Sequence, residues 1–275
     1  MANVTTPDTD REMETVTSAD GTTIAYERTG SGPPLVLVHG VGLSHRFWEL
    51  SGLRSELAEQ NTVYAIDRRG RGGSGDAEEY NLEREVDDVA TVVDSIDEPV
   101  TLLGHSFGAL IALKAAIRTD NLQGLVLYEP AFGPEVPPEM EQLLGAIKAL
   151  VADGEKEEAL ITDLTAVGTP EAALVELRSS PDWQALVDAA DTIPREFKAL
   201  FESEFDADRF TGMTTPTVLF TGEESHPALV AATETVHEAL SDSRIVVFDG
   251  QGHFAMNTAT DRFIDEVLAF TQQSN

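Results

Sequence analysis

The chain of 275 residues carries 49 acidic and 18 basic side chains, no cysteine, and a formal net charge of -31. Hydrophobic residues make up 41% of it, which excludes a disordered chain, while the lack of cysteine excludes disulfides and thiolate metal sites. The negative charge argues against nucleic acid as a partner, because it would repel the phosphates, and no run approaches the roughly 18 apolar residues that a membrane helix needs.

The predicted elements begin with a hairpin. Residues 14–18 and 22–29 flank Asp20-Gly21, a dipeptide typical of tight turns between antiparallel strands. Short apolar runs then recur at residues 35–38, 62–67, 100–103, 125–129, 216–220 and 244–248. Continuous apolar runs of this length predict strands that are buried on both faces of a parallel sheet.

Helical segments separate these runs. Apolar residues recur with helical spacing at 86–93 and at 263–270, with charged residues on the opposite face. Strands that alternate with such helices predict an α/β fold with a doubly wound, mostly parallel sheet.

One segment breaks the alternation, because residues 132–212 are rich in Ala, Leu and Glu and contain no strand-like run. We predict that this segment is a helical insertion, a lid over one end of the sheet. The predicted organisation is therefore a flexible segment at 1–12, a core at 13–131 and 213–275, and the insertion at 132–212.

The strongest motif is Gly104-His105-Ser106-Phe107-Gly108, which follows an apolar run and opens a helical stretch. Glycines two residues before and after the serine allow a tight turn between strand and helix. Such a turn projects the Ser106 hydroxyl beside a helix N-terminus, which favours developing negative charge. The motif in this setting predicts a nucleophile.

These residues make the chain resemble the α/β-hydrolase superfamily. Its third-strand H-G loop resembles residues 39–42, and the resemblance implies an oxyanion hole formed by the backbone N–H groups of Val41 and Phe107. Residues 67–74, Asp-Arg-Arg-Gly-Arg-Gly-Gly-Ser, are similar to the family's D-x-R-G-x-G-x-S loop. We interpret that loop as scaffold, because its glycines permit tight backbone turns.

The general base is expected to be His253, one of six histidines. It stands in a glycine-rich turn after the last strand-like run, where the superfamily carries its base. An imidazole near its ordinary pKa of about 6.5 can take the serine proton and return it to a leaving group. We expect His39 and His105 to pack within their loops, and His45 to be exposed or incidentally packed.

The acid that orients His253 is left open by the sequence. Most superfamily members place an Asp after the seventh strand, but this chain has Ser225 at that position. Glu129, at the end of the sixth strand, is the favoured replacement. Glu224, or Glu223, is the alternative, with a shift of one or two residues.

The resemblance implies a serine hydrolase that needs no cofactor and no metal. Its substrate is expected to be a small-molecule carboxylic ester, thioester, lactone or activated C–C bond, cleaved through an acyl-enzyme. Phe47 and Trp48 are candidates for the substrate pocket. An acyltransferase, a perhydrolase of the haloperoxidase type, or a ligand-binding protein without turnover are the alternatives.

The polar, acidic first residues are unlike a secretion signal, so we expect a cytoplasmic protein with no membrane partner. Only four of its basic residues are lysine, and its acidic residues are spread along the whole chain. A surface of one sign repels itself, and salt screens that repulsion. The composition therefore predicts a halophilic protein with an acidic-proteome surface.

Overall fold

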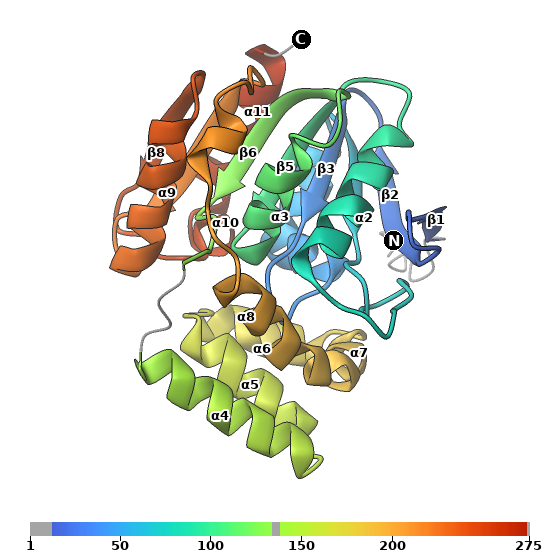
Figure 1. Ribbon diagram of the computed structural model, residues 1–275, viewed down its shortest axis with the longest axis vertical. Helices are drawn as coiled ribbons and strands as arrows, with labels where there is room; N and C mark the ends of the chain where they lie inside the picture. The colour runs from blue at the N-terminus through green and yellow to red at the C-terminus, as the bar shows by residue number, and fades with distance from the viewer. Residues whose placement is uncertain (1–12, 134–137, 274–275) are drawn as a thin grey trace, which may run out of the picture.

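The computed structural model describes residues 13–133 and 138–273, so the predicted flexible segment 1–12 lies outside the described residues. The described residues form a sheet in the order β1-β2-β4-β3-β5-β6-β7-β8 (Figure 1). Its strands are β1 (Glu14–Thr17), β2 (Thr23–Gly30), β3 (Pro34–Val38), β4 (Thr62–Ile66), β5 (Val100–His105), β6 (Leu122–Tyr128), β7 (Thr217–Gly222) and β8 (Ser243–Phe248).

The pairing of these strands confirms the predicted sheet. β1 and β2 form the antiparallel hairpin with Val16 opposite Ile24, and β2 is also antiparallel to β4. The other neighbouring pairs are parallel, as in β5 and β6, where Leu103 lies opposite Val126. Every residue of β3, β4, β5 and β7 is buried, which explains why these strands appear in the sequence as unbroken apolar runs.

Helices pack on the sheet, and α2, α3 and α9 lie in front of it in Figure 1. α2 contacts α3, α1 contacts α11, and α9 contacts β7 and β8. The helices of the core are α1 (Leu53–Leu57), α2 (Leu82–Asp94), α3 (Phe107–Ala115), α9 (Pro227–Ala239), α10 (Ala255–Thr258) and α11 (Thr260–Gln273), with a short 3-10 segment η1 (His45–Gly52) before α1. Among the described residues no helix combines the length and apolar character needed to cross a bilayer.

Further helices lie between β6 and β7, in the interval for which the sequence predicts an insertion. They are α4 (Pro138–Ala152), α5 (Lys156–Ala166), α6 (Glu171–Ser179), α7 (Trp183–Asp188) and α8 (Ile193–Phe201), with 3-10 turns η2 (Ala189–Thr192) and η3 (Ala207–Phe210). Figure 1 shows α4 to α8 gathered below the sheet, on the side toward which β6 points. These helices therefore stand next to the carboxyl ends of the parallel strands.

Three buried arginines follow β4, and we call them the arginine cluster; two of them join the inserted helices to the core. Arg68, Arg69 and Arg71 follow β4 and are each almost fully buried. Arg68 forms ion pairs with Glu85 of α2, at 2.6 Å, and with Glu196 of α8, at 3.1 Å. Arg71 also forms an ion pair with Glu196. Arg69 instead pairs with Asp88 of α2, at 2.7 Å. A buried charge without a partner is costly, so the arginine cluster fixes α8 against the loop after β4.

Candidate active site

Ser106 occupies a strained turn between β5 and α3. Its backbone has φ 58° and ψ -121°, in the positive-φ half of the Ramachandran map, which residues with a side chain seldom adopt. A Cβ on Gly104 would lie 2.4 Å from the Gly108 carbonyl oxygen, and one on Gly108 would lie 2.3 Å from that of Val38. Both glycines are therefore required by the close contact between strand and helix. The turn leaves Ser106 partly exposed between buried neighbours.

The loop after β3 lies against this serine. A Cβ on Gly40 would be 3.2 Å from the Cβ of Ser106, so the backbone at Val41 lies close to the nucleophile turn. Helix α5 contacts the same loop, because a Cβ on Gly42 would lie 2.5 Å from the Oδ2 of Asp163. Asp163 is fully buried, and burial raises the pKa of its carboxyl to about 7. Sequence reasoning missed this residue, since a single acidic residue in a helix gives no signal of burial.

His253 lies beside a buried carboxylate. Its Nδ1 is 2.5 Å from Oε2 of Glu129, which has no exposed surface. The other oxygen, Oε1, accepts hydrogen bonds from the Thr221 hydroxyl at 2.9 Å and the Gly222 amide at 2.8 Å. Burial pushes the pKa of Glu129 upward, but the bonds to His253 and Gly222 outweigh burial and hold this pKa below its usual value. Glu129 is therefore a carboxylate that keeps the imidazole proton on Nδ1.

The backbone at Glu129 explains how this carboxylate reaches the histidine. Glu129 directly follows β6 and has φ 47°, a left-handed conformation that is uncommon for a residue with a side chain. Its amide still donates to the Phe220 carbonyl of β7, at 3.1 Å. The residue thus leaves the strand abruptly at the carboxyl end of the sheet, where His253 lies.

Two buried side chains hold the turn that carries His253. His105 Nε2 is 3.0 Å from the His253 carbonyl oxygen, and the Tyr128 hydroxyl donates to the Gly252 carbonyl at 2.5 Å. Burial lowers the pKa of His105 well below its usual value, so its imidazole is neutral and donates through Nε2. The expectation that His105 packs within its loop omitted this bond to a residue 148 positions away.

The alternative acids lie elsewhere. Glu224 is exposed, and its amide donates to the Gln251 carbonyl at 2.8 Å. Glu223 is also exposed, and its carboxylate accepts from the Gly250 amide at 2.8 Å. These contacts brace the turn before His253, whereas the carboxylate in contact with the imidazole is that of Glu129.

A cavity of about 300 Å³, which we call the Ser106 cavity, opens onto Ser106 and His253. Its wall is mostly apolar and combines core residues with residues of the inserted helices. The apolar side chains that line it are Val41, Leu43, Ala131, Phe132, Met140, Leu164, Ala166, Val167, Phe197, Leu200, Phe201, Ala228, Leu229 and Phe254. None of the described residues that line it is Lys or Arg, and His226 stands exposed at its edge.

Phe47 and Trp48 are not part of this wall, contrary to expectation. Both are buried, and their rings pack edge to face with centroids 5.0 Å apart. Phe47 also stacks on the His105 ring at 5.3 Å, behind the His253 turn. The segment η1 turns both rings inward, so their proximity in sequence to the loop after β3 does not bring them to the cavity.

Several known proteins are similar to this chain. The pimeloyl-(acyl-carrier protein) methyl ester esterase of Aeromonas hydrophila is 27% identical over 259 aligned positions, which cover 90% of this chain and 98% of the esterase. The non-heme haloperoxidase of Rhodococcus erythropolis is 28% identical over 285 aligned positions, covering 94% and 100% of the two chains. The crystal structure of an alpha/beta hydrolase from Sphaerobacter thermophilus matches with a TM-score of 0.72 and 30% identity, over 91% of this chain and 99% of that one. A model of the alpha/beta hydrolase family matches residues 35–266, and the chain therefore belongs to that family.

Proposed function

We propose that this alpha/beta hydrolase is a serine esterase that cleaves small, uncharged carboxylic esters through an acyl-enzyme, with no cofactor. The observation that carries the proposal is the shared cavity of Ser106 and His253, in which His253 is hydrogen-bonded to the buried Glu129. Nucleophile, base and orienting acid are the three groups that such a reaction needs.

The chemistry follows from the protonation of these groups. Glu129 holds the proton of His253 on Nδ1, which leaves Nε2 free to take the proton of the Ser106 hydroxyl as its oxygen attacks the ester carbonyl. The backbone N–H groups of Val41 and Phe107 would stabilise the oxyanion of the tetrahedral intermediate. The imidazolium then protonates the departing alcohol, and a water molecule, activated by the same histidine, releases the acid and restores Ser106.

The cavity wall supports the substrate class. An apolar lining without Lys or Arg offers no partner for a charged group on the acyl chain, and burying an unpaired charge is costly. A cavity of about 300 Å³ fits a short or medium acyl group or an aromatic ring. Thioesters, lactones and activated C–C bonds present the same carbonyl chemistry, so they remain within the proposal.

The insertion has a part in this proposal. We take residues 132–212 as a lid on the core formed by 13–131 and 213–275, because Phe197, Leu200 and Phe201 of α8 contribute to the cavity wall. A wall built from an inserted segment limits the size of the substrate and keeps water away from the acyl-enzyme.

The substrate class can be tested with p-nitrophenyl esters of graded acyl length. We expect the highest kcat/KM for an acyl chain of intermediate length, and a steep loss for acyl groups that carry a carboxylate. Equal rates for charged and uncharged acyl groups would contradict the assignment of the cavity as an uncharged acyl site.

The alternatives are separated by two further measurements. A fluorophosphonate probe should label the wild-type protein and not Ser106→Ala; an unlabelled wild type would favour a ligand-binding protein without turnover. Peracid formation from hydrogen peroxide and acetate tests the perhydrolase alternative, which the 28% identical haloperoxidase supports. Transfer of the acyl group to added alcohols tests the acyltransferase alternative.

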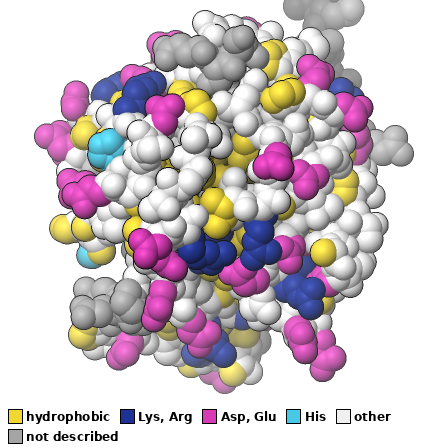
Figure 2. Space-filling view, turned by 45° about the horizontal axis from the view of Figure 1, so that its top comes forward, with side chains coloured by type: hydrophobic (Ala, Val, Ile, Leu, Met, Phe, Trp, Pro, Cys, Tyr) yellow, Lys and Arg dark blue, Asp and Glu magenta, His cyan; other side chains and the backbone are white. Residues whose placement is uncertain are grey.

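We also propose that the protein works in a cytoplasm of high salt concentration. The support is the net charge of -31 with only four lysines. Figure 2 shows acidic side chains scattered over one face of the molecule rather than gathered in one patch. Charges spread in this way repel one another over the whole surface, and salt weakens that repulsion.

A further inference from the structure

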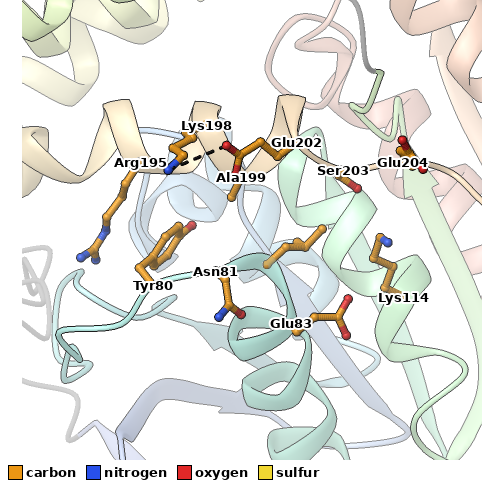
Figure 3. Close-up of a pocket in the computed structure, with 11 residues that line it drawn as sticks. Tyr80, Asn81, Glu83, Lys114, Arg195, Lys198, Ala199, Glu202, Ser203 and Glu204 are labelled. Carbon is orange, nitrogen blue, oxygen red and sulfur yellow. Dashed lines mark ion pairs between the residues drawn. The ribbon is translucent and has the colours of Figure 1, made fainter.

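A second cavity lies outside the Ser106 cavity. It is bordered by α8, the start of α2 and the end of α3 (Figure 3). We call it the Lys114 cleft; its volume is about 370 Å³. Its lining residues come from α8, from the segment just after it, from the start of α2 and from the last turn of α3. They are Tyr80, Asn81, Leu82, Glu83, Lys114, Arg195, Lys198, Ala199, Glu202, Ser203 and Glu204.

The ammonium group of Lys114 is half-buried at one end of this cleft. Within residues 13–133 and 138–273, no carboxylate lies within ion-pair distance of it, and Glu83 beside it is paired with Arg118 instead. Burial lowers the pKa of Lys114, and the charges of Arg209 and Arg118 add to that effect, while the carboxylates of Glu83 and Asp206 oppose it without reversing it. A cation in this position is stabilised by any anion that enters the cleft.

Ser203 supplies a second polar group without a partner. The residue is 6% exposed, and its hydroxyl has no hydrogen-bond partner among the described residues. Figure 3 shows Ser203 and Lys114 at the same end of the cleft, from opposite walls. A buried hydroxyl without a partner is unfavourable, so turning the Ser203 side chain toward the cleft, where a ligand atom accepts its hydrogen bond, would stabilise the site.

The rest of the cleft suits an apolar group. Leu82 and Ala199 contribute apolar surface, and the Tyr80 ring is covered by the Arg195 guanidinium at 4.4 Å. Although the chain carries only four lysines, two of them, Lys114 and Lys198, line this cleft, and Lys198 forms an ion pair with Glu202 at 3.8 Å (Figure 3).

We propose that the Lys114 cleft binds a small organic carboxylate with an apolar body. The ammonium of Lys114 and the hydroxyl of Ser203 would each bind one carboxylate oxygen, and the apolar body would rest on Leu82 and Ala199. One cation and one hydroxyl match the two oxygens and single charge of a carboxylate better than the three oxygens of a phosphate. Three glutamates also line the cleft: Glu83 is paired with Arg118 and Glu202 with Lys198, so Glu204 is the main carboxylate that opposes the anion and limits its affinity.

This site is distinct from the Ser106 cavity, although one helix borders both. Arg195, Lys198 and Ala199 of α8 face the cleft, while Phe197 and Leu200 line the Ser106 cavity. The proposal therefore does not depend on the esterase activity, and its test needs no activity assay.

The four lysines allow the site to be observed directly. Protein with 13C-labelled lysine side chains gives four Cε signals, and each Lys→Arg variant identifies one of them. Hexanoate is titrated in place of chloride at constant potassium concentration. We expect a saturating shift of the Lys114 and Lys198 signals, while Lys148 in α4 and Lys156 in α5 serve as internal controls and stay unchanged. Acetate, which lacks the apolar body, should bind at least tenfold more weakly.

Four variants test the assigned contacts. Lys114→Gln should abolish the saturable shift of the Lys198 signal, whereas Lys114→Arg, which keeps the charge, should retain binding within a few-fold. Ser203→Ala should weaken binding about fivefold, the usual effect of one lost hydrogen bond. Glu204→Gln should strengthen binding about two- to threefold, because it removes a nearby negative charge.

Three results would overturn the proposal. They are the lack of a saturable shift at Lys114, equal shifts of all four lysines, and unchanged hexanoate affinity in Lys114→Gln. Circular dichroism of each variant distinguishes loss of the site from loss of the fold. Unchanged Lys148 and Lys156 signals show in addition that the inserted helices remain folded.

Discussion

Replacing Glu129 by Gln tests the orienting role of this residue with little change of shape. Glu129 uses both oxygens: Oε2 accepts from His253, and Oε1 accepts from Thr221 and Gly222. In Glu129→Gln the Gly222 amide still needs an acceptor, because a backbone N–H cannot turn away. The amide oxygen must therefore occupy the Oε1 position, which directs the NH₂ group toward His253.

This forced orientation reverses the imidazole. A donor facing Nδ1 requires Nδ1 to accept, so the proton of His253 moves to Nε2, and Nε2 can no longer take a proton from Ser106. In a serine protease the corresponding change lowers kcat about 10⁴-fold, which corresponds to about 5 kcal/mol of transition-state stabilisation. We expect Glu129→Gln to lose between about 10² and 10⁴ in kcat, because the loss of an ion pair adds to the tautomer effect.

The assay is steady-state hydrolysis of a p-nitrophenyl ester, with active sites counted by fluorophosphonate titration. Glu224→Gln is the matched control, since it makes the same chemical change at an exposed residue, and it should lose less than tenfold. A loss below tenfold in Glu129→Gln would refute the reasoning. A large loss in Glu224→Gln with a small one in Glu129→Gln would assign the acid to the loop after β7.

Three further outcomes are expected. The thermal unfolding midpoint should rise between about 0.1 M and 2 M KCl, since salt screens a net charge of -31, and a flat or falling midpoint would contradict the proposed salt adaptation. Burial would lower the pKa of His45, but its contacts with Asp67 and Glu27 outweigh burial and raise this pKa to about 9. The stability that His45 contributes is therefore complete below pH 6.5 and is lost as the pH rises through about 9. Urea denaturation across this range should show a loss of up to roughly 3 kcal/mol in the free energy of unfolding, and His45→Gln should abolish this pH dependence. Gly108→Ala should lower the free energy of unfolding by more than about 2 kcal/mol because of its backbone clash, whereas Gly145→Ala, in open space on α4, should raise it by about 0.5 to 1 kcal/mol.

The parts of the fold that the sequence predicts are those determined by local pattern. Unbroken apolar runs predict buried parallel strands, because only a strand covered on both faces can be apolar at every position. The Gly104 to Gly108 motif predicts a close approach of strand and helix, and the contacts of both glycines agree with it. Such features depend on residues that are neighbours in the chain.

The lining of the Ser106 cavity could not be predicted in the same way. Phe197, Leu200 and Phe201 lie on one face of α8, so the sequence shows that this face is apolar. Whether that face meets the sheet, another helix or a cavity depends on how the inserted helices are placed. Phe47 and Trp48 are wrongly assigned to the pocket from the sequence because they follow the loop after β3. In the structure η1 directs both side chains into the core.

The arginine cluster shows why charge is the hardest property to interpret from a sequence of this composition. Where acidic residues outnumber basic ones so strongly, any single Asp or Glu is reasonably taken as solvated, and Glu196 carries no mark that separates it from its neighbours. Its function becomes visible only when α8 brings it to Arg68 and Arg71, more than 120 positions away in the chain. Glu129 differs because it ends a predicted strand, and the carboxyl end of a strand in a parallel sheet is a place where a side chain can reach a site. Position at the carboxyl end of a predicted strand therefore makes a buried carboxylate predictable, whereas one within a helix, such as Glu196, can be recognised only from the three-dimensional structure.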